Sequence, residues 1–329
     1  MAKAAQASVV RGHSVDYDIL VYGPLFCDLI FTQLPGMPEL GKEVFSQGFT
    51  ASIGGSAIVA AALHRLGVRV GLIADLGNDP ICQWARVLLD EFGLDQRLIR
   101  VHDWPLPQVT VALSFPHDRA FITRFERPAE PPDLAEVFQT NSAKHLHVCG
   151  FMALQETPNV VQIAHAAGLT VSMDCGWDEA SLRDPHLREV IAQVDVFLPS
   201  RNELCWIADD DDTDHALLGM STGMKTGMIV MKDGPRGVVA CSGGVIERVA
   251  ALPVIPVDTT GAGDSFDAGF LVAYTHGLPL TTCLRYGNVC GALATTAVGG
   301  AVAAPTLEEV HTWLSRLPSS EAAAPTHPV

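Results

Sequence analysis

The sequence predicts a three-layer, doubly wound α/β fold, in which a mostly parallel sheet lies between two layers of helices. Short apolar segments alternate with helical segments along most of the chain, an order typical of parallel strands joined by crossover helices. Two segments without helical periodicity interrupt this alternation and predict a separate small sheet. The 329 residues are 48% hydrophobic and only 18% charged, which is enough apolar material for a large core.

The predicted strands are short, rich in aliphatic residues and bounded by Gly, Ser or Asp. Their continuous apolar character indicates burial on both faces of the sheet. They are 18–23 (DILVYG), 68–77 (VRVGLIADLG), 144–150 (KHLHVCG), 169–176 (LTVSMDCG), 194–200 (VDVFLPS) and 228–234 (MIVMKDG). The apolar segment 249–257 (VAALPVIPV) predicts one more strand.

The predicted helices carry start and stop signals. Segment 78–93 begins with Asn and Asp as candidate caps, has Pro80 in its first turn and ends at Gly93. Segment 157–168 follows the same pattern, segment 54–67 is rich in small residues and closes with Gly67, and 266–277 follows the last predicted strand.

Residues 31–52 and 105–127 are the two segments that break the alternation. The first is rich in Gly and Pro, and the second reads as two strands around a PHDR turn. We expect both to form a small antiparallel sheet that covers a ligand cleft as a lid. The whole of 14–318 then forms one domain, with flexible tails at 1–13 and 319–329.

The net charge of −16 disfavours binding to nucleic acid or to an anionic membrane, since both need a basic surface. No apolar run approaches the roughly 18 residues of a membrane span, and the N-terminus lacks the apolar core of a secretory signal. The eight cysteines are scattered without a CxxC pair, which is typical of reduced core residues. We therefore expect a cytoplasmic protein.

The segment 258–266 (DTTGAGDSF) joins the last predicted strand to a helix. Gly261 and Gly263 allow a sharp turn and leave amide groups uncovered at the start of the helix, where the helix dipole favours an anion such as phosphate. Asp264 would lie beside that anion and could accept a proton from an attacking hydroxyl. A helix cap with turn glycines explains the short pattern equally simply, and taken alone the pattern favours that interpretation.

A longer match decides between the two. Residues 258–269 resemble the C-terminal signature of the ribokinase-like (PfkB) carbohydrate kinases, DTxGAGD followed by a small-residue helix. Further segments resemble the family in the same order along residues 18–316: Asp28, the Gly54-Gly55 segment through Gly67, 77–79 (GND), 199–203 (PSRNE), 232–237 (KDGPRG), Asn288, 291–294 (GALA) and 299–300 (GG). The family carries a small β-sheet lid, which the two irregular segments match.

The resemblance implies a role for each matched position. It makes Asp264 the catalytic base and the amides of Gly261, Ala262 and Gly263 an anion hole. It places Asp28, Gly54 and Gly55 on the hydroxyl-binding side. It places Ser200, Lys232, Gly234, Thr259 and Asn288 on the ATP side, and gives Glu203 a water-mediated part in holding Mg²⁺. Asp258 and the backbone of 299–301 lie where many members bind a monovalent cation such as K⁺.

Two positions depart from the family pattern. Val59 replaces an Asn that commonly bonds a substrate hydroxyl, which predicts a less polar substrate pocket. Ser200 replaces the Asn of PNxxE and reaches less far toward phosphate or metal-bound water. Arg119 and Arg124 lie on the predicted lid, where each is either a residue of the hairpin or a contact to substrate.

His145, His147 and Cys149 alternate along one predicted strand, so they share a face. Such a set could bind a metal, but the sequence suggests no further ligand, and we interpret it as a strand with partly buried imidazoles.

These patterns together predict an ATP-dependent kinase that phosphorylates a hydroxyl of a sugar, sugar acid or nucleoside. The alternatives are a kinase of an already phosphorylated sugar, for which Lys42, Arg119 and Arg124 are the basic candidates, and a non-catalytic ligand sensor on the same fold. A dinucleotide-dependent oxidoreductase would need GxGxxG after the first strand, and VYGPLFCD does not supply it. The acceptor stays open, and so does the oligomeric state, because lid-to-lid dimers and monomers both occur among similar proteins.

Overall fold

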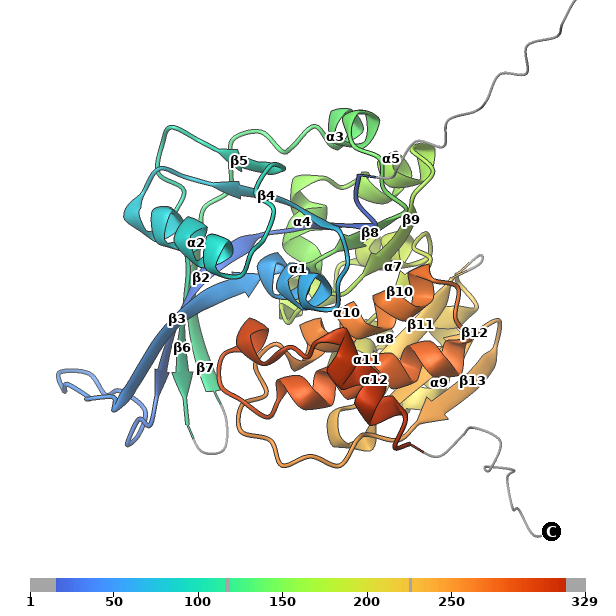
Figure 1. The fold of residues 1–329 in the computed structure, drawn as a ribbon. Helices are drawn as coiled ribbons and strands as arrows, with labels where there is room; N and C mark the ends of the chain where they lie inside the picture. Colours follow the sequence, from blue (N-terminus) through green and yellow to red (C-terminus); the bar gives the residue numbers. More distant parts are fainter. Residues whose placement is uncertain (1–15, 116–118, 225–226, 318–329) are drawn as a thin grey trace, which may run out of the picture.

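A computed structural model describes residues 16–115, 119–224 and 227–317. The predicted tails 1–13 and 319–329 and most of the PHDR turn lie outside this described part. The fold is the predicted one: a large, mostly parallel sheet between two helical layers, with a separate small sheet that projects from one side (Figure 1). No helix in the described ranges has the length and apolar character needed to cross a membrane.

The large sheet has nine strands, of which the last two pair antiparallel and the others parallel. In spatial order they are β13 (Val245–Val249), β12 (Val238–Ser242), β11 (Met228–Lys232), β10 (Val196–Phe197), β9 (Thr170–Met173), β8 (His145–Val148), β1 (Ile19–Tyr22), β4 (Val70–Leu76) and β5 (Ile99–Val101).

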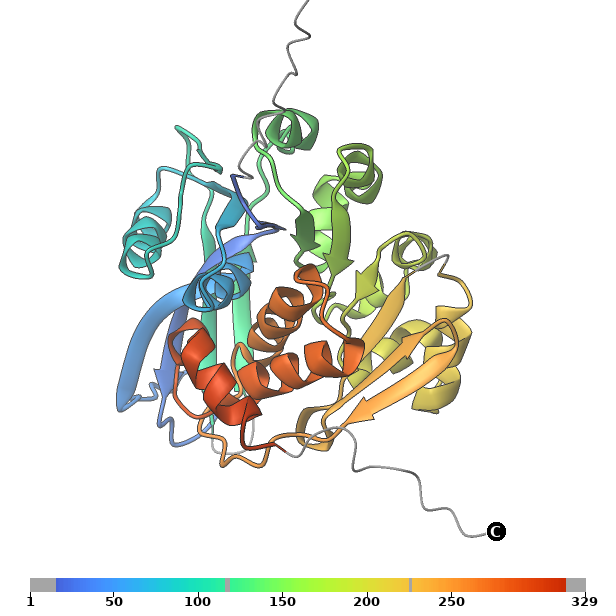
Figure 2. The same cartoon turned by 45° about the vertical axis from the view of Figure 1, so that its right-hand side comes forward.

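Helices cover both faces of this sheet, as the turned view in Figure 2 shows. On one face lie α1 (Ser56–Arg65), α2 (Pro80–Glu91), α10 (Ala262–Thr275), α11 (Leu280–Ala294), the short η2 (Gly300–Ala303) and α12 (Leu307–Leu314). On the other lie α3 (Leu134–Thr140), α4 (Gly150–Glu156), α5 (Val160–Ala166), α6 (Glu179–Leu182), α7 (Pro185–Ile191), α8 (Arg201–Ala208) and α9 (Thr213–Ser221).

Strand β1, which lies between β8 and β4, is covered on both faces, and this explains its apolar sequence. Ile19 and Val21 point into the core beneath α1 and α10, whereas Leu20 and Tyr22 point into the core on the opposite face. Successive side chains of a strand face opposite sides, so a strand covered on both sides needs apolar residues at every position.

The small sheet has the strand order β3 (Gly48–Gly55), β2 (Leu25–Thr32), β6 (Gln108–Ser114) and β7 (Arg119–Phe125). It differs from the expected antiparallel sheet, because its central pair β2 and β6 runs parallel. Its strands also extend beyond segment 31–52, since β2 starts at Leu25 and β3 includes the Gly54-Gly55 pair. The segment predicted as the helix 54–67 therefore begins its helix only at Ser56.

The prediction of a strand at 249–257 is wrong. Strand β13 ends at Val249, and the following apolar residues form a loop that ends at Pro256. Pro253 and Pro256 have no amide hydrogen to donate to a neighbouring strand, so the segment cannot extend the sheet. It lines a pocket instead, as described below.

Candidate active site

The site lies where the carboxyl ends of the parallel strands meet the first turn of α10. The helix begins directly after Gly261, whose φ of 68° is in the left-handed region that favours glycine. The first-turn amides of α10 therefore face the loop 258–261, with the positive end of the helix dipole behind them. Ala262 also donates its amide at 3.3 Å to the Thr259 carbonyl, which closes the turn.

Two pockets lie on either side of this helix start. The first has a volume of about 300 Å³ and contains Asp264 at its inner end. The apolar residues and glycines of its wall are Pro24, Phe26, Gly55, Cys149, Gly150, Phe151, Met152, Cys175, Gly176 and Trp177. The other polar wall residues are Ser56, Gln155, Asp174, Asp178 and Ser181. Within the described ranges, no lysine or arginine lines it.

The second pocket has a volume of about 510 Å³ and contains six of the residues expected near nucleotide or phosphate. They are Lys232, Gly234, Thr259, Ala262, Gly263 and Asn288. The loop 251–256, which the sequence predicted as a strand, supplies an apolar wall through Leu252 and Val254. Asn288 holds that wall in place by donating from Nδ2 to the carbonyl oxygens of Val249 and Ala250 at 3.2 and 3.0 Å.

Two carboxyl groups that lie close enough to interact electrostatically, Asp264 and Asp28, have raised pKa values. Burial and the negative charge of Asp174 raise the pKa of Asp264 to about 7, against the opposing effect of the Lys232 ammonium. Burial and the charge of Asp264 likewise raise the pKa of Asp28 to about 7. A proton acceptor with a pKa near 7 is strong enough to take a proton and still ionised in part at neutral pH.

Gly54 is required by the position of Asp28. A Cβ atom on residue 54 would lie 2.1 Å from Oδ1 of Asp28, so any larger residue would push that carboxylate away. The structure thus brings together Asp28 of β2, Gly54 of β3 and Asp264 of α10, which the sequence predicted as parts of one site.

Lys232 is engaged by a carboxylate that the sequence did not reveal. Its Nζ donates to both oxygens of Asp267, at 3.0 and 2.8 Å, and the Asp267 side chain is completely buried. Burial disfavours the ammonium, but the charges of Asp267, Asp174 and Glu203 raise the pKa of Lys232 above its ordinary value. Lys232 is therefore a fixed positive charge in the wall of the larger pocket.

Glu203 and Ser200 form the capping box of α8. Glu203 Oε2 accepts the Ser200 amide at 2.6 Å, and Ser200 Oγ accepts the Glu203 amide at 3.3 Å. Besides the capping box, Glu203 forms a hydrogen bond with the Cys175 side chain, whose pKa is raised by burial and by the charges of Glu203 and Asp174. The charge of Glu203 acts on both Lys232 and Asp264, which places it at the same cluster.

The two lid arginines have different environments. Arg119 pairs with Asp258 at 3.5 Å and donates to Thr260 Oγ1, so it joins the lid to the glycine loop. Arg124 pairs with Glu126 at 2.6 Å, and its side chain is 64% exposed. The two are five positions apart on β7, and an odd spacing places them on opposite faces of the strand.

Asp258 is held by the loop around it. Burial opposes its ionisation, but hydrogen bonds from Thr260 and from the Gly299 amide lower the pKa of Asp258. Val59 lies in neither pocket wall, because its side chain is 0% exposed within the core around α1.

A family model of the pfkB family carbohydrate kinases matches residues 17–307. The chain belongs to the PfkB family. It is therefore a phosphotransferase that acts on an alcohol group, and its relatives are sugar and nucleoside kinases.

Three curated PfkB relatives show the range of acceptors. The fructokinase of Klebsiella pneumoniae is 31% identical, over 77% of this chain and 88% of its own length. The nucleoside kinase of Methanothermobacter thermautotrophicus is 29% identical, over 84% and 88%. The ATP-dependent ribose-1-phosphate kinase of Halopiger xanaduensis is 30% identical, over 85% and 92%.

A solved structure supports the fold of this PfkB kinase. A ribokinase II of Escherichia coli, in complex with ATP and Mg²⁺, is 25% identical and superposes with a TM-score of 0.77. The match covers 92% of this chain and all of the other. The similarity confirms the predicted ribokinase-like architecture with its lid.

The sequence patterns did not single out two acidic residues of this PfkB site, Asp174 and Asp267. Asp174 directly follows β9, and ligand sites of doubly wound sheets lie at the carboxyl ends of strands, so its position was the available signal. Asp267 lies one turn after Asp264 on α10, and three-residue spacing places both on one side of a helix. Nothing in the sequence indicated that Lys232 would be the partner of Asp267.

Proposed function

We propose that this protein transfers the γ-phosphoryl group of ATP to a hydroxyl of a small sugar, sugar acid or nucleoside, with Asp264 as the catalytic base. The observation that carries the proposal is the position of the 261–264 helix start between two pockets. Asp264 lines the smaller pocket and Gly263 lines the larger one, so an acceptor and a nucleotide could meet at the first-turn amides.

The residues of the larger pocket fit ATP. Its apolar wall suits a base, whereas the helix start and Lys232 supply positive potential for phosphates. The carboxylate of Glu203, whose charge acts on Lys232 and Asp264, is of the kind that Mg²⁺ prefers together with water. When bound, the metal–nucleotide pair supplies the transferable phosphoryl group and neutralises charge that develops on it.

The chain's own residues would do the remaining work. Asp264 accepts the hydroxyl proton, the amides of Gly261, Ala262 and Gly263 stabilise the transferring group, and Asp28 orients the acceptor through a second hydroxyl. We also propose that a monovalent cation such as K⁺ binds beside Asp258. Comparing turnover in potassium salts with turnover in tetramethylammonium salts tests this.

The smaller pocket favours an acceptor without a phosphate group. Lys42, Arg119 and Arg124, the basic candidates for a phosphorylated substrate, pair with Glu39, Asp258 and Glu126 respectively. An acceptor phosphate would therefore meet no lysine or arginine among the described wall residues. Because the Halopiger relative is a ribose-1-phosphate kinase, phosphorylated sugars are the second candidate class of acceptor and belong in any substrate panel.

The decisive experiment is ADP release across a panel of sugars, sugar acids, nucleosides and sugar phosphates. We expect one class to stimulate turnover, and Asp264→Asn to lower kcat by about 10²–10⁴-fold while ATP still binds by calorimetry. Asp214→Asn, which changes an exposed carboxylate paired with Arg248, is the matched control and should leave kcat unchanged. A sensor would show no stimulated turnover, and its ligand response would survive Asp264→Asn.

We also propose a homodimer that pairs through the lid. Phe45, Phe49, Phe121 and Ile122 are large apolar residues of the lid, and each is more than half exposed. Light scattering coupled to size-exclusion chromatography should give twice the monomer mass, and Ile122→Asp should return the protein to a monomer.

A further inference from the structure

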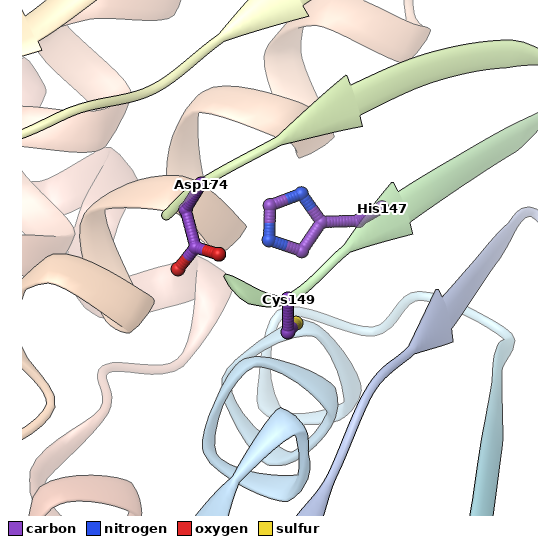
Figure 3. A group of neighbouring side chains, drawn as sticks. All are labelled: His147, Cys149 and Asp174. Atoms are coloured by element: carbon purple, nitrogen blue, oxygen red, sulfur yellow. The ribbon is translucent and has the colours of Figure 1, made fainter. Parts of the chain in front are cut away.

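A cluster of three potential metal ligands lies beside the catalytic carboxylates. His147 belongs to β8, Cys149 directly follows β8, and Asp174 directly follows β9 (Figure 3). One ligand atom from each residue lies within 4.8 Å of the other two. Figure 3 shows the His147 ring directed toward the Asp174 carboxylate, with the Cys149 side chain next to both.

A buried chain of hydrogen bonds fixes which nitrogen of His147 carries the proton. Thr170 Oγ1 donates to the Lys144 carbonyl, so it must accept from His145 Nδ1 at 2.7 Å. His145 Nε2 is then the acceptor and receives the single hydroxyl proton of Ser172 at 2.7 Å. Ser172 Oγ, which has no second proton, accepts from His147 Nδ1 at 2.8 Å. His147 Nε2 consequently carries a lone pair.

This directionality requires His145 to be neutral, because its Nε2 accepts a hydrogen bond, and burial without a hydrogen-bonded carboxylate keeps His147 neutral as well. Both are completely buried, and an imidazolium without a hydrogen-bonded carboxylate is costly there. Burial accordingly lowers the pKa of each ring to about 3.

The lone pair of His147 Nε2 is an unexplained feature of the core. Among the described residues, this nitrogen is buried and has no hydrogen-bond partner. An unpartnered buried acceptor costs on the order of 1–3 kcal/mol, so it calls for a ligand that the protein alone does not supply.

We propose that His147 Nε2, Cys149 Sγ and Asp174 bind a borderline-soft divalent transition-metal ion of the zinc class. Imidazole, thiolate and carboxylate are the three donor types that such an ion accepts. The set is unsuited to Mg²⁺, which prefers oxygen alone. The bond from His147 Nδ1 to Ser172 is the outer contact that commonly orients a metal-bound histidine.

The geometry leaves one coordination position open. Cys149 and Asp174 both line the 300 Å³ pocket, so a fourth ligand would come from that side as water or as a bound small molecule. Ligand atoms around zinc lie roughly 3.4–3.7 Å apart, given bond lengths of about 2.0–2.3 Å. Binding therefore requires the three ligand atoms, which lie within 4.8 Å of one another, to move closer together. On binding, the S–H bond of Cys149 breaks and its proton leaves to solvent, so that the thiolate becomes the ligand.

The ion would also affect catalysis if the proposed function holds. Besides burial, the charge of Asp174 contributes to the raised pKa of Asp264, and a dication on Asp174 would cancel that contribution. It would also occupy the inner wall of the acceptor pocket. Zinc-class ions therefore inhibit the kinase, a consequence that can fail without affecting the binding site itself.

The test measures metal binding by the full chain without substrates. Co²⁺ titration should give a thiolate-to-cobalt charge-transfer absorption at one equivalent, and Zn²⁺ should remove it whereas Mg²⁺ should not. Competition with a chromophoric chelator gives the Zn²⁺ affinity, and calorimetry in two buffers should detect release of about one proton.

Three variants and one control locate the site. His147→Asn keeps a donor to Ser172 but removes Nε2, and Cys149→Ser removes the thiolate. Each should weaken Zn²⁺ binding by about 100-fold or more, and Ser172→Ala by about 10–100-fold through loss of the outer contact. Cys205→Ser is the control, since this partly exposed thiol lies on α8 outside the cluster.

The proposal is overturned if the charge-transfer band is absent or survives Cys149→Ser, or if His147→Asn binds Zn²⁺ as tightly as the parent. Circular dichroism and urea unfolding of each variant establish that it is folded. If the parent binds no ion although His147→Asn is folded, the missing hydrogen-bond partner of His147 Nε2 has some other explanation and the proposed metal site is refuted.

Discussion

Replacing Lys232 with methionine should strongly destabilise the protein. The change removes the ammonium that lies 2.8 and 3.0 Å from the oxygens of Asp267, whose side chain is 0% exposed. The buried carboxylate would then have to be protonated at neutral pH. Protonating a carboxyl group whose ordinary pKa is about 3.9 costs about 4 kcal/mol at pH 7, because each pH unit above the pKa adds about 1.4 kcal/mol. This agrees with the roughly 3–5 kcal/mol typical of breaking a buried ion pair.

The pH dependence of this loss follows from the same reasoning. The unpaired Asp267 would have a raised pKa in the folded variant. The loss in free energy of unfolding is therefore largest at high pH and disappears as the pH falls toward the pKa of Asp267 in the unfolded chain. We expect a loss of about 4 kcal/mol at pH 7 and about 1.5 kcal/mol at pH 5. Equilibrium urea unfolding of parent and variant at both pH values measures the difference.

Two further variants make the result specific. Arg236→Met removes one partner of the Arg236–Asp233 pair, in which the arginine is 61% exposed, and should cost less than about 1 kcal/mol. The double variant Lys232→Met with Asp267→Leu replaces the buried pair by apolar groups and should recover much of the loss. The reasoning is refuted if Lys232→Met costs no more than Arg236→Met, or if the two changes at 232 and 267 are additive.

Three shorter predictions concern the site. Turnover should rise with pH through about 7 as Asp264 loses its proton. Asp28→Asn should move the midpoint of this rise to lower pH, because it removes a like charge near Asp264. A kcat–pH profile without an acidic limb near 7 contradicts the assignment of Asp264 as the base. Gly54→Ala should raise the acceptor KM by about tenfold or more, because its Cβ would lie 2.1 Å from Asp28, whereas Gly36→Ala, with no atom within 4 Å, should change nothing in steady-state assays. Removal of Mg²⁺ with a chelator should abolish turnover reversibly, and Glu203→Gln should raise the Mg²⁺ concentration needed for half-maximal rate by about 10–100-fold; an unchanged requirement would exclude Glu203 from the metal's surroundings.

The sequence predicted the layered fold because burial leaves a local pattern. Strand 19–22 is apolar at every position since helices cover both of its faces, and 70–76 departs from this only at Asp75. The helix 80–91 was equally readable, because Asp79 caps it and Pro80 opens its first turn. The apolar segment 249–257 misled the prediction, since apolar character marks burial but two prolines prevent the pairing that makes a strand.

Local spacing also indicated part of the site. The order of glycines and Asp264 in 258–264 pointed to a helix start that could bind an anion, and the structure has that helix start at Ala262. It could not show which lid arginine reaches the loop. That depended on the face of β7 turned toward the body, and Arg119 rather than Arg124 lies on it.

The sequence by itself determined the family and most of the elements in their order, because these depend on neighbours within a few residues along the chain. Only the tertiary structure decided which distant groups share a charge environment. Asp267 and Lys232 are 35 positions apart. His147 lies on β8 and Asp174 directly follows the neighbouring β9, and the register of these two strands brings the residues together. Electrostatic coupling and metal ligation act through space over a few ångströms, so residues remote in sequence acquire a function only when the sheet aligns their strand ends.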